Sequence, residues 1–359
     1  MAAAAYDPRF CLKPQPRDRG RLPMNLSLSR RALLATALLL ALPPAFAAGT
    51  SLLNVSYDVS REFYKDFNAA FAAQWKKTSG EDITLNQSHG GSSKQARSVV
   101  EGLEADVITM NQANDIDILA ERGKLIPPDW ARRLPYNSAP TTSISVMLVR
   151  KGNPKAIHDW SDLGRPGVSV IIPNPKTSGN GRYTYLAAWG AAVKNGVSPE
   201  AARALVARIF ANVPVLDGGG RGATTTFAQR NLGDVLVTFE SEVPLIEREF
   251  GGGYEVIYPS RTILAENPVS IVDKVVDKCG TRKAAEAYLQ YLYSDAGQEL
   301  AAKHHLRPRN EKVLAKYASA FPKVATFTVD EVFGGWAKAQ KDHFNDGAQY
   351  DQIVGPGKK

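Results

Sequence analysis

The chain has 359 residues and carries 44 Lys and Arg against 36 Asp and Glu, a formal net charge of +8 at pH 7. Much of this charge lies in the first 47 residues, which hold seven basic and two acidic side chains, so the remainder carries a net charge of only +3. The basic balance is therefore no indication of nucleic-acid binding. The 312 residues that follow suit two lobes rather than one.

Residues 1–47 have the pattern of an export leader. Arg30 and Arg31 precede an eleven-residue apolar run over 32–42, and Pro-Pro-Ala-Phe-Ala follows at 43–47. A charged region, a short apolar region and an Ala-x-Ala site predict a signal peptide cleaved after about Ala47 and a mature protein in the periplasm. The run is too short for a permanent membrane anchor. Met24 is a candidate for the true start, and a buried helix of the folded domain is the alternative interpretation of the run.

Strand-like runs alternate with amphipathic helices between residues 48 and 142. Phe63, Phe67, Phe71 and Trp75 recur every four residues, which is typical of one apolar helical face. We expect further helices at 92–103 and 116–122, and strands at 52–57, 83–86 and 106–110. This alternation predicts an α/β fold with a mainly parallel sheet.

The same alternation continues to the end of the chain. We expect strands at 143–149, 168–172, 235–239 and 256–258, a crossing segment at 263–272, and helices at 183–193, 199–210 and 283–300 before a polar helical tail. The simplest arrangement is two lobes joined by two crossing strands. It assigns 48–142 to the first part of lobe 1, 143–262 to lobe 2, and 263–359 to a return crossing to lobe 1 plus C-terminal helices.

Four junctions where a strand-like run leads into a helix share small and hydroxyl-bearing residues. They lie at 56–61, 88–94, 174–182 and 217–224. Such residues leave first-turn N–H groups free and let an anion approach them, and helix N-termini of this kind bind oxyanions. Any single junction is more simply explained as ordinary capping without a ligand. The glycines at 90–91 and 218–222 fit neither a Walker motif nor a dinucleotide fingerprint.

Several segments together resemble the periplasmic sulfate/thiosulfate-binding proteins of ABC importers. The resemblance runs in order through nearly the whole mature chain and is carried by 53–58, 87–92, 149–154, 174–179, 263–266 and 333–336. It implies the two-lobed, type II periplasmic binding-protein fold, with the ligand in the cleft between the lobes. It also implies a non-enzymatic, monomeric receptor without a cofactor, whose partners are the anion and the permease subunits of the importer.

Carried over by position, the resemblance implies an anion site built only from hydrogen-bond donors. One lobe would supply the backbone N–H groups of Asp58 and Ser92. The other would supply the Ser178 hydroxyl and the N–H groups of Gly179, Asn180 and Gly220. Sulfate and thiosulfate carry no proton at neutral pH, whereas hydrogen phosphate would bring a donor that such a site leaves unpaired.

Two positions bear on which anion binds and how. Phe239 stands where sulfate-type members place a Trp whose indole contacts the anion, and Phe has no donor. In this respect, and in Asn180, the chain most resembles the thiosulfate-binding type, which leads to the hypothesis that thiosulfate binds at least as well as sulfate. Arg182 and Arg221 flank the site, where they would attract the anion or brace the loops.

Two other functions remain open at this point. The first is a binder of another tetrahedral oxyanion. The second is an esterase acting on sulfate or phosphate esters with Ser178 as nucleophile, although the sequence offers neither a Gly-x-Ser-x-Gly context nor a general base beside Ser178. His158, His304 and His305 have no third ligand at metal spacing, so no metal site is expected.

Overall fold

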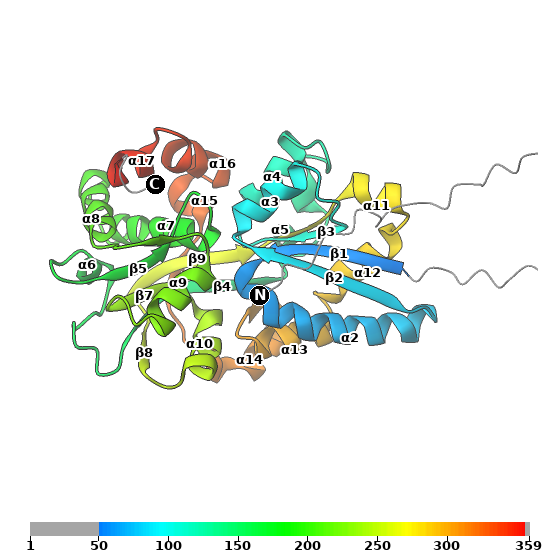
Figure 1. The fold of residues 1–359 in the computed structure, drawn as a ribbon, viewed down its shortest axis with the longest axis horizontal. Coiled ribbons are helices and arrows are strands. Elements are labelled where there is room, and N and C mark those ends of the chain that lie inside the picture. Colours follow the sequence, from blue (N-terminus) through cyan, green and yellow to red (C-terminus); the bar gives the residue numbers. More distant parts are fainter. Residues whose placement is uncertain (1–49, 356–359) are drawn as a thin grey trace, which may run out of the picture.

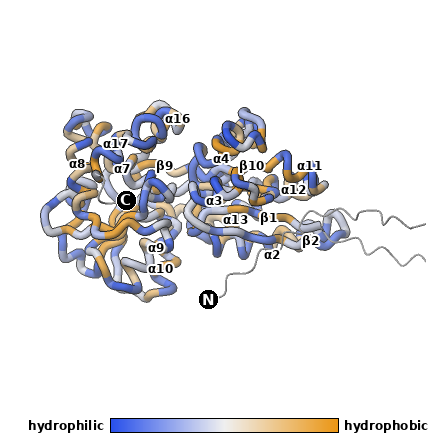
Figure 2. Tube along the Cα trace, turned by 45° about the horizontal axis from the view of Figure 1, so that its top comes forward, coloured by the Kyte–Doolittle hydropathy of each residue, from blue (hydrophilic) through white to orange (hydrophobic). Residues whose placement is uncertain are grey.

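The computed structural model describes residues 50–355, which form two lobes lying side by side (Figure 1). The predicted leader and its cleavage site lie outside the described residues. Within 50–355, lobe 1 holds a four-stranded sheet of order β10-β3-β1-β2, and lobe 2 holds an eight-stranded sheet with the path β12-β9-β4-β7-β5-β6. Hydrophobic residues concentrate in several clusters, one of which extends from lobe 2 to Tyr57 and Val59 of lobe 1 (Figure 2).

Lobe 1 is a sheet covered by helices on both faces. Its elements are β1 (Thr50–Tyr57), α2 (Arg61–Ser79), β2 (Ile83–Gly90), α3 (Ser92–Val100), β3 (Val107–Thr109), α4 (Ala113–Glu121), β10 (Val269–Ile271), α11 (Asp273–Cys279), α12 (Arg282–Tyr291) and α13 (Asp295–Lys303). The apolar face expected for α2 is buried, and Phe67 and Phe71 each meet the Tyr288 ring of α12 edge-on at 5.1 Å. Strand β1 pairs in parallel with β2 and β3, as predicted.

Lobe 2 is built around the buried strand β4. Its elements are β4 (Thr141–Arg150), α6 (Trp160–Leu163), β5 (Val170–Pro173), α7 (Gly179–Lys194), α8 (Pro199–Ala211), β6 (Leu216–Asp217), α9 (Gly220–Thr224), β7 (Val235–Phe239), α10 (Val243–Phe250), β8 (Tyr254–Ile257) and β9 (Arg261–Asn267). The expectation of a mainly parallel sheet is wrong here, because β4 is antiparallel to β7, β8 and β9. Strands β8 and β9 follow one another along the same side of β4 without the crossover helix that parallel pairing requires.

Between residues 50 and 355 the chain passes between the lobes three times rather than the expected two. Strand β4 enters lobe 2, and the segment 261–271 returns as two strands because Pro268 interrupts it. After β11 (Arg307–Pro308) and α14 (Glu311–Lys316), the chain goes back and adds β12 (Ala325–Phe327) beside β9. The final helices α15 (Val329–Phe333), α16 (Trp336–Ala339) and α17 (Gln349–Val354) therefore lie with lobe 2 (Figure 1).

The single helix expected at 283–300 is in fact two helices, α12 and α13. Ser294 caps the second helix, and its Oγ accepts a hydrogen bond from the Gly297 N–H at 3.1 Å. A Cβ on Gly297 would lie 2.1 Å from the Tyr291 carbonyl oxygen, so only glycine allows the two helices to approach this closely. The apolar periodicity continues across the break, so the sequence pattern predicts one helix over 283–300.

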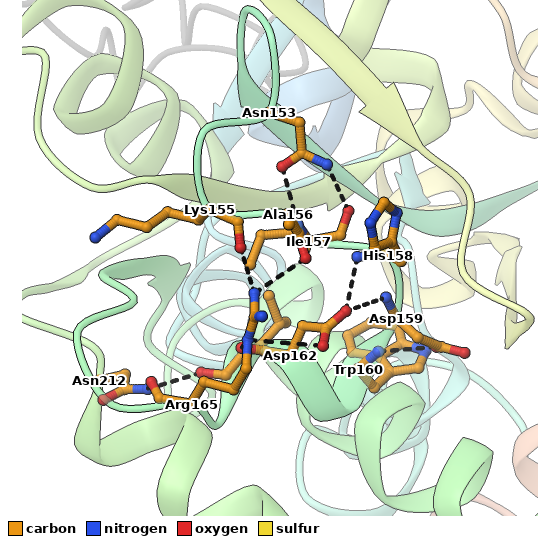
Figure 3. A network of polar contacts seen from close by, with 11 residues as sticks. Asn153, Lys155, Ala156, Ile157, His158, Asp159, Trp160, Asp162, Arg165 and Asn212 are labelled. Carbon is orange, nitrogen blue, oxygen red and sulfur yellow. Dashed lines mark hydrogen bonds and ion pairs between the residues drawn. The ribbon is translucent and has the colours of Figure 1, made fainter.

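The connection from β4 to β5 is held by polar contacts (Figure 3). The Asn153 side chain makes two hydrogen bonds to the Ile157 backbone. Its Oδ1 accepts from the N–H at 2.9 Å, and its Nδ2 donates to the carbonyl at 2.8 Å. Asp162 accepts from the N–H groups of His158 and Asp159 at 2.8 and 3.0 Å. This network holds together the loop and the short helix α6 that lead towards β5.

Candidate anion-binding site between the lobes

Two helix N-termini of lobe 1 start side by side. Tyr57 at the end of β1 pairs with Gly90 at the end of β2, and the two strands are parallel. Asp58 begins a short helical turn that leads into α2, and Ser92 is the first residue of α3. The register therefore brings both helix starts to one edge of the sheet.

Two helix N-termini of lobe 2 are aligned in the same way. Pro173 of β5 pairs with Asp217 of β6, and the Asn174 N–H donates to the Asp217 carbonyl at 2.7 Å. Thr177 Oγ1 donates to the Gly218 carbonyl at 3.0 Å, which joins the two following loops. Helices α7 and α9 start just beyond this contact.

The two pairs of helix starts face each other across the lobe boundary. A Cβ on Gly91 would lie 2.7 Å from the Thr177 carbonyl oxygen and 2.8 Å from that of Gly218. A Cβ on Gly179 would lie 1.9 Å from Oδ1 of Asn111 in lobe 1. With backbone from both lobes this close, the structure is the closed form.

Most of the donor residues expected from the sequence are buried at this boundary. Ser92 is 1% exposed, and Ser178 and Asn180 are each 3% exposed. First-turn amides such as those of Ser92, Gly179, Asn180 and Gly220 have no acceptor inside their own helices. Ser178 caps α7, where its Oγ accepts from the Gly181 N–H at 3.4 Å, and its own hydroxyl hydrogen is left for another acceptor. The boundary therefore concentrates first-turn donors from both lobes.

Asp58 is half-buried, and its carboxylate is used within the protein. Its Oδ2 accepts from the Arg221 N–H at 3.2 Å. Burial raises the pKa of this carboxyl, and hydrogen bonds from the amides of Arg221 and Val59 oppose the rise. The side chain thus joins the lobes, and the residue lies at a helix start.

Phe239 ends β7 beside these donors. Its ring is 2% exposed, meets the Tyr183 ring edge-on at 5.8 Å, and belongs to the buried cluster that holds Tyr57 and Val59 on either side of Asp58. The preceding residue, Thr238, accepts a hydrogen bond at 3.3 Å from Asn180 Nδ2. The two positions that distinguish the thiosulfate type in the sequence are therefore neighbours in space.

Arg182 braces the site from the α7 side. Its Nε donates to the Pro175 carbonyl at 2.9 Å, and its Nη1 lies 3.8 Å from Asp115 Oδ1 in lobe 1. Asp115 in turn accepts from Ser92 Oγ at 2.5 Å and from Gln112 Nε2 at 2.7 Å. Sequence reasoning missed Asp115 and Gln112, although the polar run 111–115 directly after a buried strand was a usable signal.

Arg221 braces the opposite side through carboxylates. It pairs with Glu62 of lobe 1 at 3.2 Å and with Glu249 of lobe 2 at 3.1 Å. Glu242 is 1% exposed, and burial raises its pKa well above the ordinary value, with Asp58, Glu62 and Glu249 adding to the rise and Arg221 opposing it. In the sequence these glutamates carry no distinctive local pattern, so their place beside Arg221 is not predictable from it.

Of the histidines noted in the sequence, His304 and His305 line a cavity together with Glu62 of lobe 1 and Glu242 of lobe 2. His304 Nε2 is 2.9 Å from Asp66 on the surface, and His158 belongs to the β4–β5 connection. Within residues 50–355, no group of three or more His, Cys, Asp or Glu side chains is arranged to hold a metal ion. None of the helices in that range is both long and apolar enough to cross a membrane.

Two lobes closing over converging helix N-termini define a solute receptor rather than an enzyme. Residues 55–307 match the family model of the bacterial extracellular solute-binding proteins, and the chain belongs to this family, in the branch of the sulfate- and thiosulfate-binding proteins.

Relatives and a solved structure agree with this membership. A thiosulfate-binding protein of Pseudomonas aeruginosa is 62% identical over 88% of this chain and 96% of its own length. A sulfate-binding protein of Salmonella typhimurium is 56% identical over the same shares. The solved sulfate-binding protein SubI of Mycobacterium tuberculosis has a TM-score of 0.75 and 31% identity, covering 82% of this chain and all of that one. The α/β two-lobed periplasmic binding-protein fold expected from the sequence is thereby confirmed.

Proposed function

We propose that this chain captures sulfate or thiosulfate between its lobes in the periplasm and delivers it, as a monomer, to the permease subunits of an ABC importer. The observation that carries the proposal is the convergence of four helix starts from both lobes on one buried boundary. The ligands named for the relatives from Pseudomonas and Salmonella are thiosulfate and sulfate, respectively.

The chemistry of the boundary favours a fully deprotonated dianion. We assign the backbone N–H groups of Asp58, Ser92, Gly179, Asn180 and Gly220 and the Ser178 hydroxyl as donors. A hydrogen bond to a charged group contributes about 1.5–3 kcal/mol, and each helix dipole adds about 0.3–1 kcal/mol. Because the donors are divided between the lobes, only the closed form satisfies the anion completely, and binding would drive closure.

We infer further that thiosulfate binds at least as well as sulfate. A terminal sulfur is larger than oxygen and a poorer hydrogen-bond acceptor, so it loses less by facing a phenyl ring. Phe239 directly follows Thr238, whose hydroxyl accepts a hydrogen bond from Asn180 Nδ2, and we place its ring against the terminal sulfur. Within this proposal, Phe239 sets the preference between the two anions.

Titration calorimetry on the wild type and on Phe239→Trp tests the proposal. We expect saturable binding of thiosulfate and sulfate, much weaker binding of phosphate, and a shift towards sulfate in Phe239→Trp because the indole adds a donor. Phe239→Leu is the matched control, since it removes the ring without adding a donor, and should not favour sulfate.

Two results would contradict these assignments. Sulfate binding at least tenfold tighter than thiosulfate in the wild type would overturn the preference. Absence of binding to either anion, or turnover of a sulfate or phosphate ester, would overturn the receptor function itself.

A further inference from the structure

A second cavity lies at the rim of the lobe boundary, on the Arg182 side. It has a volume of about 570 Å³ and is lined by Arg97 and Arg122 of lobe 1, by Lys176 and Arg182 of lobe 2, and by C-terminal residues that include Asn345. An adjoining cavity of about 310 Å³ shares Arg97, Arg122, Arg182 and Asn345. We call the two together the rim cavity.

The rim cavity is lined by as many carboxylates as cations, but they are not all paired with one another. Lys176 is paired with Asp346 at 3.4 Å and Asp351 at 3.0 Å, which accounts for both carboxylates on the larger wall. On the smaller wall, Asp115 lies 3.8 Å from Arg182, Asp117 accepts from Trp130 Nε1 at 2.9 Å, and Glu121 is exposed.

Arg97 and Arg122 are exposed cations on the wall of the rim cavity. Within the part of the chain that the structure describes, neither side chain has a hydrogen bond or an ion pair.

Arg182 is the buried element of this cavity. Its side chain is only 7% exposed, and its Nη1 has no hydrogen-bond partner among the described residues, because the nearest Asp115 oxygen is 3.8 Å away. Burial lowers the pKa of Arg182, and Arg97 lowers it further while Asp115 opposes the change. Burying a guanidinium near another cation across the lobe boundary is energetically unfavourable. A bound anion would offset this by pairing with the unpartnered Nη1.

We propose that the rim cavity is a second binding site for a divalent oxyanion, held by Arg182 together with Arg97 and Arg122. Guanidinium groups bind an anion through its negative charge and through pairs of its oxygens. They do not require that the anion be fully deprotonated. The rim site should therefore accept hydrogen phosphate as well as sulfate-like ions, in contrast to the donor-only site at the helix starts.

The rim site is complete only when the lobes are closed. Arg97 and Arg122 come from lobe 1 and Arg182 from lobe 2, so a rim anion stabilises the closed form and tightens binding at the first site. This step rests on the proposed function, because it requires that the lobes close over a first anion.

Crystals of the protein grown with selenate, and without sulfate, test the rim site directly. We expect one anomalous selenium peak between the four helix starts and a second within hydrogen-bond distance of Arg182 and of Arg97 or Arg122. The variant Arg97→Gln/Arg122→Gln should lose only the second peak. A wild-type crystal with the first peak and no second peak overturns the rim site, whereas loss of the first peak would instead contradict the proposed function.

Fluorescence titration with thiosulfate, with and without inorganic phosphate at constant ionic strength, tests the coupling. Phosphate should lower the thiosulfate Kd at least twofold in the wild type and have no such effect in Arg97→Gln/Arg122→Gln. The matched control is Arg208→Gln/Arg230→Gln, which removes the same charge from exposed positions outside the cavity and should behave as the wild type. An equal phosphate effect in all three proteins, or none in the wild type, would overturn the coupling.

Discussion

The backbone N–H of Arg221 in lobe 2 donates a hydrogen bond to Oδ2 of Asp58 in lobe 1 at 3.2 Å. A Cβ on the neighbouring Gly219 would lie 2.4 Å from the same oxygen. At this contact the backbone of lobe 2 packs directly on a side chain of lobe 1, and there is no room for an added methyl group. Closure can be tested at such contacts separately from the donors themselves.

Gly91→Ala should block closure. Gly91 has φ −56° and ψ 128°, which alanine adopts without strain, but the new Cβ would meet the carbonyl oxygens of Thr177 and Gly218 in the other lobe. Overpacking of this kind costs about 1–3 kcal/mol, so the anion Kd should rise about 10- to 100-fold by calorimetry while the melting temperature without anion stays unchanged. Gly218→Ala is the control, because its Cβ would meet no atom within 4 Å. Equal losses in the two variants would refute the closure argument.

Glu242 should make the closed protein less stable as pH rises. Burial raises its pKa above the ordinary 4.5, so its favourable contribution is complete below about pH 4.5 and is lost as pH rises through the elevated pKa of the folded protein. Glu242→Gln keeps the shape without the charge. The melting temperature of the wild type with bound anion should fall more between pH 5 and 8 than that of the variant, and parallel curves would contradict the assignment.

His343 should act in the opposite sense, at acid pH. Burial lowers its pKa from 6.5 to about 4, so the stability it contributes is present above pH 6.5 and is lost as pH falls towards 4. His343→Phe with Tyr185→Phe removes the imidazole and its 3.0 Å partner together. Because burial also lowers the pKa of His89 to about 4 and lowers that of His305, the double variant should lose only part of the histidine-linked acid destabilisation in thermal melts at pH 7 and pH 5. Tyr185→Phe alone is the control and should retain all of it.

Arg307→Met should strongly destabilise the protein. Arg307 Nε and Nη2 donate to the two carboxylate oxygens of Glu240 at 2.7 and 2.9 Å, and the Glu240 side chain is only 3% exposed. Loss of the cation leaves a buried carboxylate, which costs about 3–5 kcal/mol of unfolding free energy in urea denaturation. Arg307→Met/Glu240→Gln should recover most of that loss, and an unstable double variant would show that Arg307 acts mainly through packing.

Local signals in the sequence predicted most of the secondary structure. Strand β7 has the predicted bounds, and α8 differs by one residue, because an uninterrupted apolar run and a Ser198-Pro199 helix start are local features. The break between α12 and α13 was missed because it depends on Gly297 fitting against Tyr291, a contact that periodicity does not contain.

By itself, the sequence determined the α/β alternation, the two-lobed class and the four helix starts rich in small residues, since capping and spacing are properties of neighbouring residues. Only the tertiary structure decided that the C-terminal helices lie on lobe 2, that Asp115 and the glutamates surround the site, and that Arg97, Arg122 and Arg182 share one cavity. These relationships join residues far apart in the chain. Strand register and lobe closure bring these residues together, and both depend on contacts between segments that are distant in the sequence.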